Sequence, residues 1–178
     1  GHVLAEADML QAVCTSVVKH GLTRPILTAS EHSFVRVCGL RHPIIERVNT
    51  QELYVTNDLS LGDVESGMLL YGTNAVGKSS LIKALGICVL MAQVGMFVPA
   101  SSLEICPYTA IYTRILGNDN LYRGLSTFAV EMSELRNILG DADGHTLVLG
   151  DELCSGTESQ SAHCIFAAGI EWLHRVNC

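Results

Sequence analysis

The stretch that most constrains the fold runs from Gly72 to Ser80 and reads GTNAVGKSS. A short apolar run, residues 68–71, precedes it, and good helix-forming residues follow it. The pattern predicts a buried strand over 68–71, a glycine loop, and a helix from about Lys78 to Gly95. Glycines let consecutive backbone N–H groups converge on phosphate oxygens, and the following helix adds the positive end of its dipole. The spacing is that of a P-loop, the Walker A pattern, and predicts a site for a nucleoside triphosphate.

The P-loop pattern gives individual residues separate tasks. Lys78 would bridge the β- and γ-phosphates, and Ser79 would ligate Mg²⁺. The residues expected to hold the nucleotide are the loop and the first turn of the helix: Gly72, Thr73, Asn74, Ala75, Val76, Gly77, Lys78, Ser79 and Ser80.

A second motif lies downstream, where the apolar run 147–149 is followed by Gly150, Asp151 and Glu152. A strand that ends in Asp-Glu is a Walker B pattern: Asp151 would meet Mg²⁺ through water, and Glu152 would polarise the attacking water as a general base. Alone, the same residues would fit a strand followed by a solvated acidic turn. Together with the P-loop they favour hydrolysis over phosphoryl transfer to a small acceptor molecule. The chain has no Asn-Lys-x-Asp guanine-binding motif, so the expected ligands are ATP and Mg²⁺.

Helical and strand patterns alternate along the rest of the chain. Apolar residues at helical spacing predict helices over 3–19, with a cap at Gly21, over 128–139, and from the capping-box spacing at 157–160 onward. The last helix has an apolar face that comprises Ala162, Ile165, Phe166, Gly169, Ile170 and Leu173. Strands are expected at 34–40, 53–55, 59–61, 111–116 and 146–149. This alternation predicts an α/β P-loop NTPase with a mostly parallel core sheet flanked by helices.

Composition and charge narrow the classes of function. The chain has 178 residues, enough for about one domain with a buried core, and 48% of them are hydrophobic. The formal net charge is −7, with 11 basic against 18 acidic residues. The chain as a whole therefore offers no basic surface for nucleic acid.

The cysteines and the apolar segments point to a soluble protein of the cell interior. None of the seven cysteines forms a C-x-x-C pair, which favours small buried thiols in a reducing compartment. The N-terminal stretch carries Glu6 and Asp8, where a signal peptide would need positive charge. The apolar stretch 84–100 is interrupted by Gln93 and Pro99, so a buried helix is expected there rather than a membrane span.

Several short motifs follow one another in an order and spacing that resemble a known family. They are Arg41-His42-Pro43; Gly72-Thr73-Asn74 with Gly77-Lys78-Ser79; Val98-Pro99-Ala100; Ser126-Thr127-Phe128 with Glu131-Met132; and Asp151-Glu152 with Gly156-Thr157. With these motifs, nearly the whole chain resembles the ATPase domain of the MutS family of DNA mismatch-repair proteins. After Asp151-Glu152 the sequence continues Leu-Cys-Ser-Gly-Thr instead of the common version with Gly-Arg-Gly-Thr. This variation resembles a divergent branch found in large viruses and some organelles.

The resemblance implies an ABC-type ATPase, in which two domains face each other and enclose two ATP molecules. It implies that Tyr54 stacks on adenine, that Asn74 lies near the γ-phosphate and takes part in catalysis, and that Ser126 reaches the γ-phosphate bound by the opposite subunit. It also places Cys154 at the contact with that subunit. From the residues alone, Tyr54 fits a half-buried strand tyrosine almost as well, Ser126 fits a helix cap, and Cys154 fits a structural cysteine.

The resemblance also divides the chain and suggests its partners. Residues 1–22 would be the end of a helical lever that leads to DNA-binding parts. Residues 23–178 would be the ATPase domain, stopping before the family's C-terminal strand and helix-turn-helix segment. The expected function is ATP binding and hydrolysis, weak in isolation, with the nucleotide state controlling a DNA clamp in the whole protein. The expected partners are a second copy or a paralogous ATPase domain, and mismatched DNA through domains absent here, with no membrane.

Two other functions remain open on the sequence. One is another ABC-type ATPase, of the transporter or chromosome-maintenance kind, although the chain lacks the Leu-Ser-Gly-Gly-Gln motif of transporters. The other is a module that holds nucleotide and dimerises without turnover. Release of phosphate by the purified chain would separate an ATPase from such a module.

Overall fold

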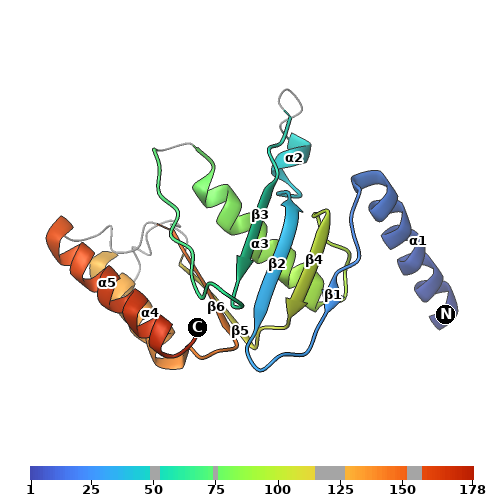
Figure 1. Ribbon diagram of the computed structural model, residues 1–178. Coiled ribbons are helices and arrows are strands. Elements are labelled where there is room, and N and C mark those ends of the chain that lie inside the picture. The colour runs from blue at the N-terminus through green and yellow to red at the C-terminus, as the bar shows by residue number, and fades with distance from the viewer. Residues whose placement is uncertain (49–52, 74–75, 115–126, 152–157) are drawn as a thin grey trace.

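The computed structural model describes residues 1–48, 53–73, 76–114, 127–151 and 158–178 (Figure 1). The helices in these ranges are α1 (His2–His20), α2 (Ile45–Val48), α3 (Lys78–Gln93), α4 (Thr127–Asp141) and α5 (Ser159–Arg175). The strands are β1 (Ile26–Leu27), β2 (Phe34–Leu40), β3 (Asn57–Leu61), β4 (Ser102–Cys106), β5 (Ala110–Arg114) and β6 (Thr146–Gly150). The architecture is α/β, as predicted.

The strands form two sheets. The larger sheet has the order β1-β4-β2-β3, in which β1 is parallel to β4 but β2 is antiparallel to both β4 and β3. The smaller sheet pairs β5 with β6 in parallel. The expectation of a mostly parallel core sheet is therefore wrong for the larger sheet. Val35 and Val37 of β2 are buried while Arg36 and Cys38 are more exposed, an alternation typical of an antiparallel strand with one solvated face.

Helix α3 covers one face of the larger sheet (Figure 1) and supplies much of the core. Its residues Cys88 and Val89 are fully buried, in one cluster with Val35 of β2 and Ile105 of β4. The stretch 84–100 therefore begins in a buried helix, as predicted. No helix in the described ranges is long and apolar enough to cross a membrane.

The cysteines follow the predicted pattern only in part. Burial raises the pKa of the Cys88 thiol to about 12, so this residue is an unreactive apolar side chain. Cys106 is also buried, whereas Cys14, Cys38 and Cys164 are exposed and Cys178 is half-buried. The exposed cysteines lie on α1, β2 and α5.

Helices cover both faces of the smaller sheet. On one face, Gly86 of α3 approaches Leu149 of β6 so closely that a Cβ at Gly86 would lie 2.9 Å from Leu149 Cδ1. On the other face, α4 and α5 lie side by side (Figure 1), and Trp172 Nε1 donates a hydrogen bond of 2.8 Å to the Leu139 carbonyl. A cavity of about 30 Å³ remains between these helices and the sheet, lined by Arg114, Leu135, Ile138, Val148, Ile165, Phe166, Gly169, Ile170 and Leu173. The predicted apolar face of α5, apart from Ala162, lines this cavity.

Two predicted strands are wrong. Residues 68–71 are not paired in a sheet, and Leu69 and Tyr71 are 63% and 92% exposed. Residues 53–55 are likewise outside the strands. A short apolar run indicates that a segment favours burial, but a strand forms only where a neighbouring strand bonds its backbone N–H and C=O groups. Among the described strands, β5 and β6 pair only with each other and β3 pairs only with β2, so both runs remain connections.

The helix predictions hold better. The helix expected over 3–19 spans His2–His20 and ends at Gly21, whose φ of 55° is left-handed, as its predicted role as a cap requires. The helix over 128–139 is α4, which continues through Gly140 and Asp141. The last helix begins at Ser159, and Thr157 of the predicted capping box lies outside the described residues.

Candidate nucleotide-binding site

The glycine loop leads directly into α3, as predicted. Gly77 immediately precedes the helix and has φ 97° and ψ 9°, a left-handed conformation that residues with a Cβ rarely adopt. Apart from its two chain neighbours, no heavy atom of the described residues lies within 4 Å of the place where a Cβ of Gly77 would stand. The backbone angle therefore favours glycine here, whereas no crowding by the described residues requires it.

Lys78 folds back over the loop. Its Nζ donates hydrogen bonds to the carbonyl oxygens of Gly72 at 2.7 Å and Thr73 at 2.8 Å. These contacts engage two of the three hydrogens of the ammonium group and hold the two ends of the loop together. The structure thus brings together the first glycine and the lysine of the sequence motif, six positions apart.

The start of α3 has no acidic residue in its first turn. Ser79 and Ser80 lie in this turn and are half-buried. The first N–H groups of a helix have no partners within the helix and carry the positive end of its dipole. The ammonium of Lys78 and this helix start therefore combine into one electropositive place, which suits a phosphate group.

Asp151 follows β6 and is held by the backbone. Its N–H donates to the Arg114 carbonyl at 2.7 Å, which extends the β5–β6 ladder by one residue. On the strand itself, Leu149 meets α3 at Gly86. Figure 1 shows α3 beginning and β6 ending at the same side of the molecule. The strand end that carries Asp151 and the helix start that carries Lys78 and Ser79 therefore lie at the same side of the molecule.

Several predicted site residues cannot be placed. Asn74, Ala75, Ser126, Glu152 and Cys154 lie outside the described residues. Tyr54 is half-buried and lies in a connection between α2 and β3. Among the described residues, no hydrogen bond or ion pair joins Tyr54 to the glycine loop, and its predicted stacking on adenine stays a prediction.

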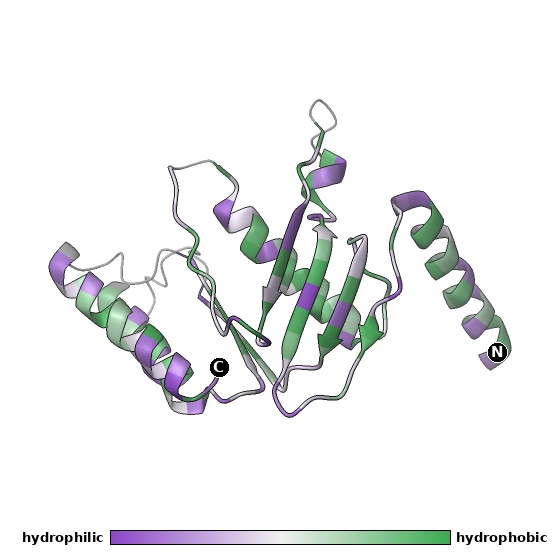
Figure 2. Cartoon of the chain, in the orientation of Figure 1, coloured by the Kyte–Doolittle hydropathy of each residue, from purple (hydrophilic) through white to green (hydrophobic). Residues whose placement is uncertain are grey.

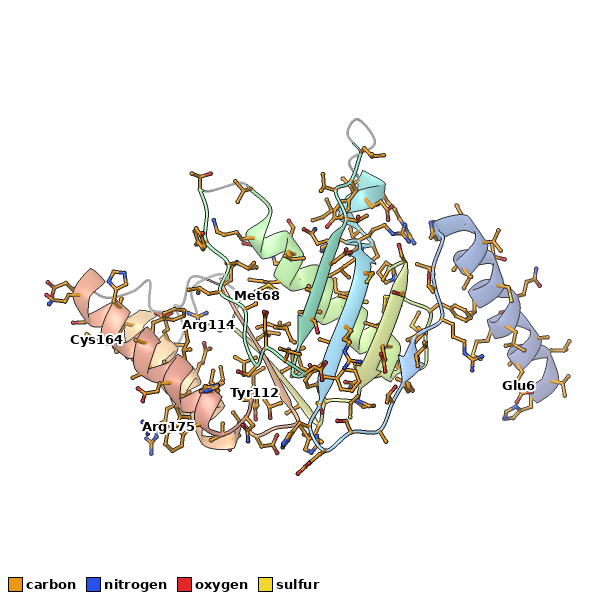
Figure 3. The ribbon with its side chains drawn as sticks, viewed as in Figure 1. Glu6, Met68, Tyr112, Arg114, Cys164 and Arg175 are labelled. Carbon is orange, nitrogen blue, oxygen red and sulfur yellow. The ribbon has the colours of Figure 1, made fainter. Side chains whose placement is uncertain are left out.

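The sequence did not single out Arg114, which lies beside the candidate site. It is opposite Gly150 at the end of β5, and its carbonyl receives the N–H of Asp151. Its Nε lies 3.0 Å from Glu134 Oε2 of α4, and Figure 3 shows Arg114 on the side of the molecule that carries α4 and α5. Arg114 therefore ties the strand end that carries Asp151 to α4. An arginine at the end of a strand gives no sequence signal for such a contact.

Comparison with known proteins places the chain in a family. Residues 68–178 match the sequence model described as MutS domain V. The chain is 42% identical over 176 residues to the mitochondrial DNA mismatch repair protein mutS homolog of Sarcophyton glaucum, with 97% of this chain and 18% of that protein covered. It is 37% identical to the DNA mismatch repair protein MutS of Chlorobium limicola, with 97% of this chain and 20% of that protein covered.

A viral relative is similar to the same extent. The putative DNA mismatch repair protein mutS homolog of Acanthamoeba polyphaga mimivirus is 36% identical, with 94% of this chain and 18% of that protein covered. Mitochondrial, viral and bacterial relatives thus all fall within 36–42% identity, and the viral or organellar branch stays a prediction. The chain spans about a fifth of the length of these relatives. Its match to domain V over residues 68–178 and its identity to these relatives along nearly its whole length show that the chain belongs to the MutS family of DNA mismatch-repair proteins.

Proposed function

We propose that the chain binds ATP with Mg²⁺ and hydrolyses the ATP, as the ATPase part of a DNA mismatch-repair protein. The observation that carries this proposal is the loop from Gly72 to Lys78, closed by the two hydrogen bonds of the lysine at the open start of α3. An ammonium group and a helix start on one loop are the groups that bind phosphates in P-loop proteins. The residues present therefore fit a nucleoside triphosphate.

The proposed roles follow from this placement. Lys78 and the first N–H groups of α3 would hold the phosphates, and Ser79 with Asp151 would hold Mg²⁺, an ion that prefers oxygen ligands. The metal would neutralise negative charge on the phosphates. Glu152, next to Asp151 in the sequence, would orient and deprotonate the attacking water.

Three further roles rest on the family relationship alone. Tyr54 would contact the adenine, Asn74 the γ-phosphate, and Ser126 the γ-phosphate bound by a second copy or a paralogous domain. In the whole protein the nucleotide state would control a clamp on mismatched DNA, through parts of the protein beyond these residues. The cell interior is the compartment in which we expect this function.

The first test is calorimetric titration of Mg-ATP into the chain and into Lys78→Ala. A hydrogen bond to a charged group is worth about 1.5–3 kcal/mol, so the affinity should fall by about 10- to 150-fold. Lys83→Ala is the matched control, because Lys83 is an exposed lysine of the same helix beyond the loop, and its affinity should match that of the wild type. Equal affinities for wild type and Lys78→Ala would remove the P-loop assignment.

A second test addresses the alternative that the chain holds nucleotide without turnover. Membership of the MutS family disfavours a transporter-type ATPase, but it leaves this alternative standing. The wild-type chain should release phosphate from ATP, and Glu152→Gln should bind ATP with unchanged affinity while releasing none. Binding without any release of phosphate by the wild type would favour the non-catalytic module.

A further inference from the structure

Packing does not set the direction of α1. None of its residues is buried, and Val3, Leu4 and Val18 are 76–85% exposed. Figure 1 shows α1 standing apart from the sheet, and Figure 2 shows apolar and polar residues along its length. Among the described residues, the hydrogen bonds from the body of the protein to α1 and its cap lie at the C-terminal end of the helix.

Arg41 acts at that end. Its Nη2 donates to the carbonyl oxygens of His20 at 3.2 Å and Gly21 at 2.6 Å, which are the last carbonyls of α1 and its cap. These carbonyls carry the negative end of the helix dipole, so a cation is favourable there. Arg41 is itself fixed, because its backbone N–H donates to the Pro99 carbonyl at 2.9 Å and its side chain is only 19% exposed.

The same guanidinium also holds α2. Nη1 of Arg41 donates to both carboxylate oxygens of Glu46, at 2.9 and 3.1 Å. Glu46 is kept in place by the next residue of the motif, since the Glu46 N–H donates to the His42 carbonyl. His42 is 5% exposed, and its Nδ1 accepts weak hydrogen bonds of 3.3 Å from the N–H groups of Ile44 and Ile45 at the start of α2.

The charges around this junction make Glu46 important. Lys19, His20, Arg41 and Arg47 bring basic groups to it. Desolvation first, and then the positive charges of Arg47 and Lys19, lower the pKa of His20, while Glu46 acts to raise it. Without the carboxylate, Arg41 would lose the ionic partner that it has on α2. The ion pair between Arg41 and Glu46 is therefore the contact that links the two helices.

We propose that Arg41 is a positioning residue that couples the direction of α1 to α2 by bonding both helices with one guanidinium. The planar, five-donor group of arginine suits this task because it reaches two carbonyls and a carboxylate at fixed angles. A lysine keeps the charge but donates from a single flexible nitrogen, so it would serve one partner at a time. This coupling goes beyond the proposed ATPase function and does not depend on it.

Distance measurement between two spin labels tests the proposal. Cys14 on α1 and Cys38 on β2 are exposed and accept nitroxide labels once cysteines 154, 164 and 178 are changed to serine. Double electron–electron resonance on the whole chain then reports the angle of α1 as a distribution of label distances. We expect one narrow distribution for the chain with Arg41, at least a twofold broader one for Arg41→Ala, and an intermediate width for Arg41→Lys.

The control is Arg175→Ala, which removes an exposed arginine that pairs with Glu171 on α5. Figure 3 labels Arg175 on α5 and Glu6 on α1, at opposite ends of the molecule. Arg175→Ala should leave the width unchanged. An unchanged width in Arg41→Ala, or equal broadening in Arg175→Ala, would overturn the proposal. If Arg41→Ala fails to fold, Arg41→Lys decides, because a width equal to that of the wild type would contradict the coupling.

Discussion

The side chain of Gln93, the last residue of α3, makes hydrogen bonds to both backbone groups of Tyr108, as a neighbouring strand would. Its Nε2 donates to the Tyr108 carbonyl at 3.1 Å, and its Oε1 accepts from the Tyr108 N–H at 2.8 Å. Tyr108 is 7% exposed and lies in the connection between β4 and β5, where the chain passes from the larger sheet to the smaller one. One side-chain amide therefore satisfies both backbone groups of a buried residue and ties α3 to this connection.

We predict that Gln93→Leu destabilises the protein strongly. Leucine has a similar size and favours helices, but it leaves the N–H and C=O of Tyr108 without partners. Each backbone group left unsatisfied costs about 1–3 kcal/mol, so the loss of partners for both groups should lower the free energy of unfolding by about 2–6 kcal/mol. In a chain of this size 1 kcal/mol shifts the melting temperature by about 2–4 °C, which gives a decrease of roughly 4–24 °C.

Urea unfolding followed by far-ultraviolet circular dichroism measures the change. The matched control is Gln11→Leu, the same substitution at an exposed position of α1, which should change the free energy of unfolding by no more than about 0.5 kcal/mol. An unfolding midpoint of Gln93→Leu equal to that of the wild type would refute the reasoning. So would an equal loss in both variants, because the effect would then come from leucine rather than from Tyr108.

Two further predictions concern the fold. Gly169→Ala should raise the free energy of unfolding by about 1 kcal/mol, because alanine favours a helix more than glycine does and no described atom outside the helix crowds a Cβ at this position. The gain should be slightly larger than for Gly140→Ala, because Gly169 lines the cavity beneath α5 and its new methyl group would partly fill that cavity, and thermal melts of both variants check this order. Burial, and to a smaller extent the positive charge of Lys83, lowers the pKa of His42 in the folded protein. As the pH falls, His42 is therefore protonated in the unfolded chain before it is protonated in the folded one, and the folded protein loses stability from the ordinary pKa of 6.5 down to the lowered pKa. His42→Asn should therefore lose less stability than the wild type between about pH 8 and about pH 5.5, whereas His163→Asn, at an exposed position, should follow the wild type in urea melts at both pH values.

Local patterns predicted those parts of the fold that depend on neighbours in the sequence. The helix over 3–19 is predictable because its stripe of apolar residues and the glycine after it are signals within a few residues. The alternation in 34–40 indicates a strand for the same reason. The glycine loop is the strongest such case, since Gly72, Gly77 and Lys78 lie within one short stretch and their contacts stay within it.

Contacts between distant residues were not predictable in this way. Residues 68–71 pair with no described strand, and the sequence around them gives no sign of this. The sequence around β2 likewise does not indicate that both of its neighbouring strands are antiparallel to it. Tyr108 and Gln93 are 15 positions apart, and Arg36 and Glu104, whose Nη1 and Oε2 form a hydrogen bond of 3.0 Å across β2 and β4, are 68 apart. Each of these contacts joins two elements that the sequence predicts separately.

The sequence by itself predicted four helices (α1, α3, α4 and α5), four strands (β2, β3, β5 and β6), the glycine loop with its lysine, and the family, but it gave no prediction of α2, β1 or β4. Only the tertiary structure decided that the larger sheet is mixed, that the N–H of Asp151 bonds the Arg114 carbonyl beside β5, and that Arg41 bonds α1 and α2 together. The reason is physical. A helix or a tight loop completes its hydrogen bonds within a few residues, whereas a strand, an ion pair or a metal site is completed by a partner that only folding brings near.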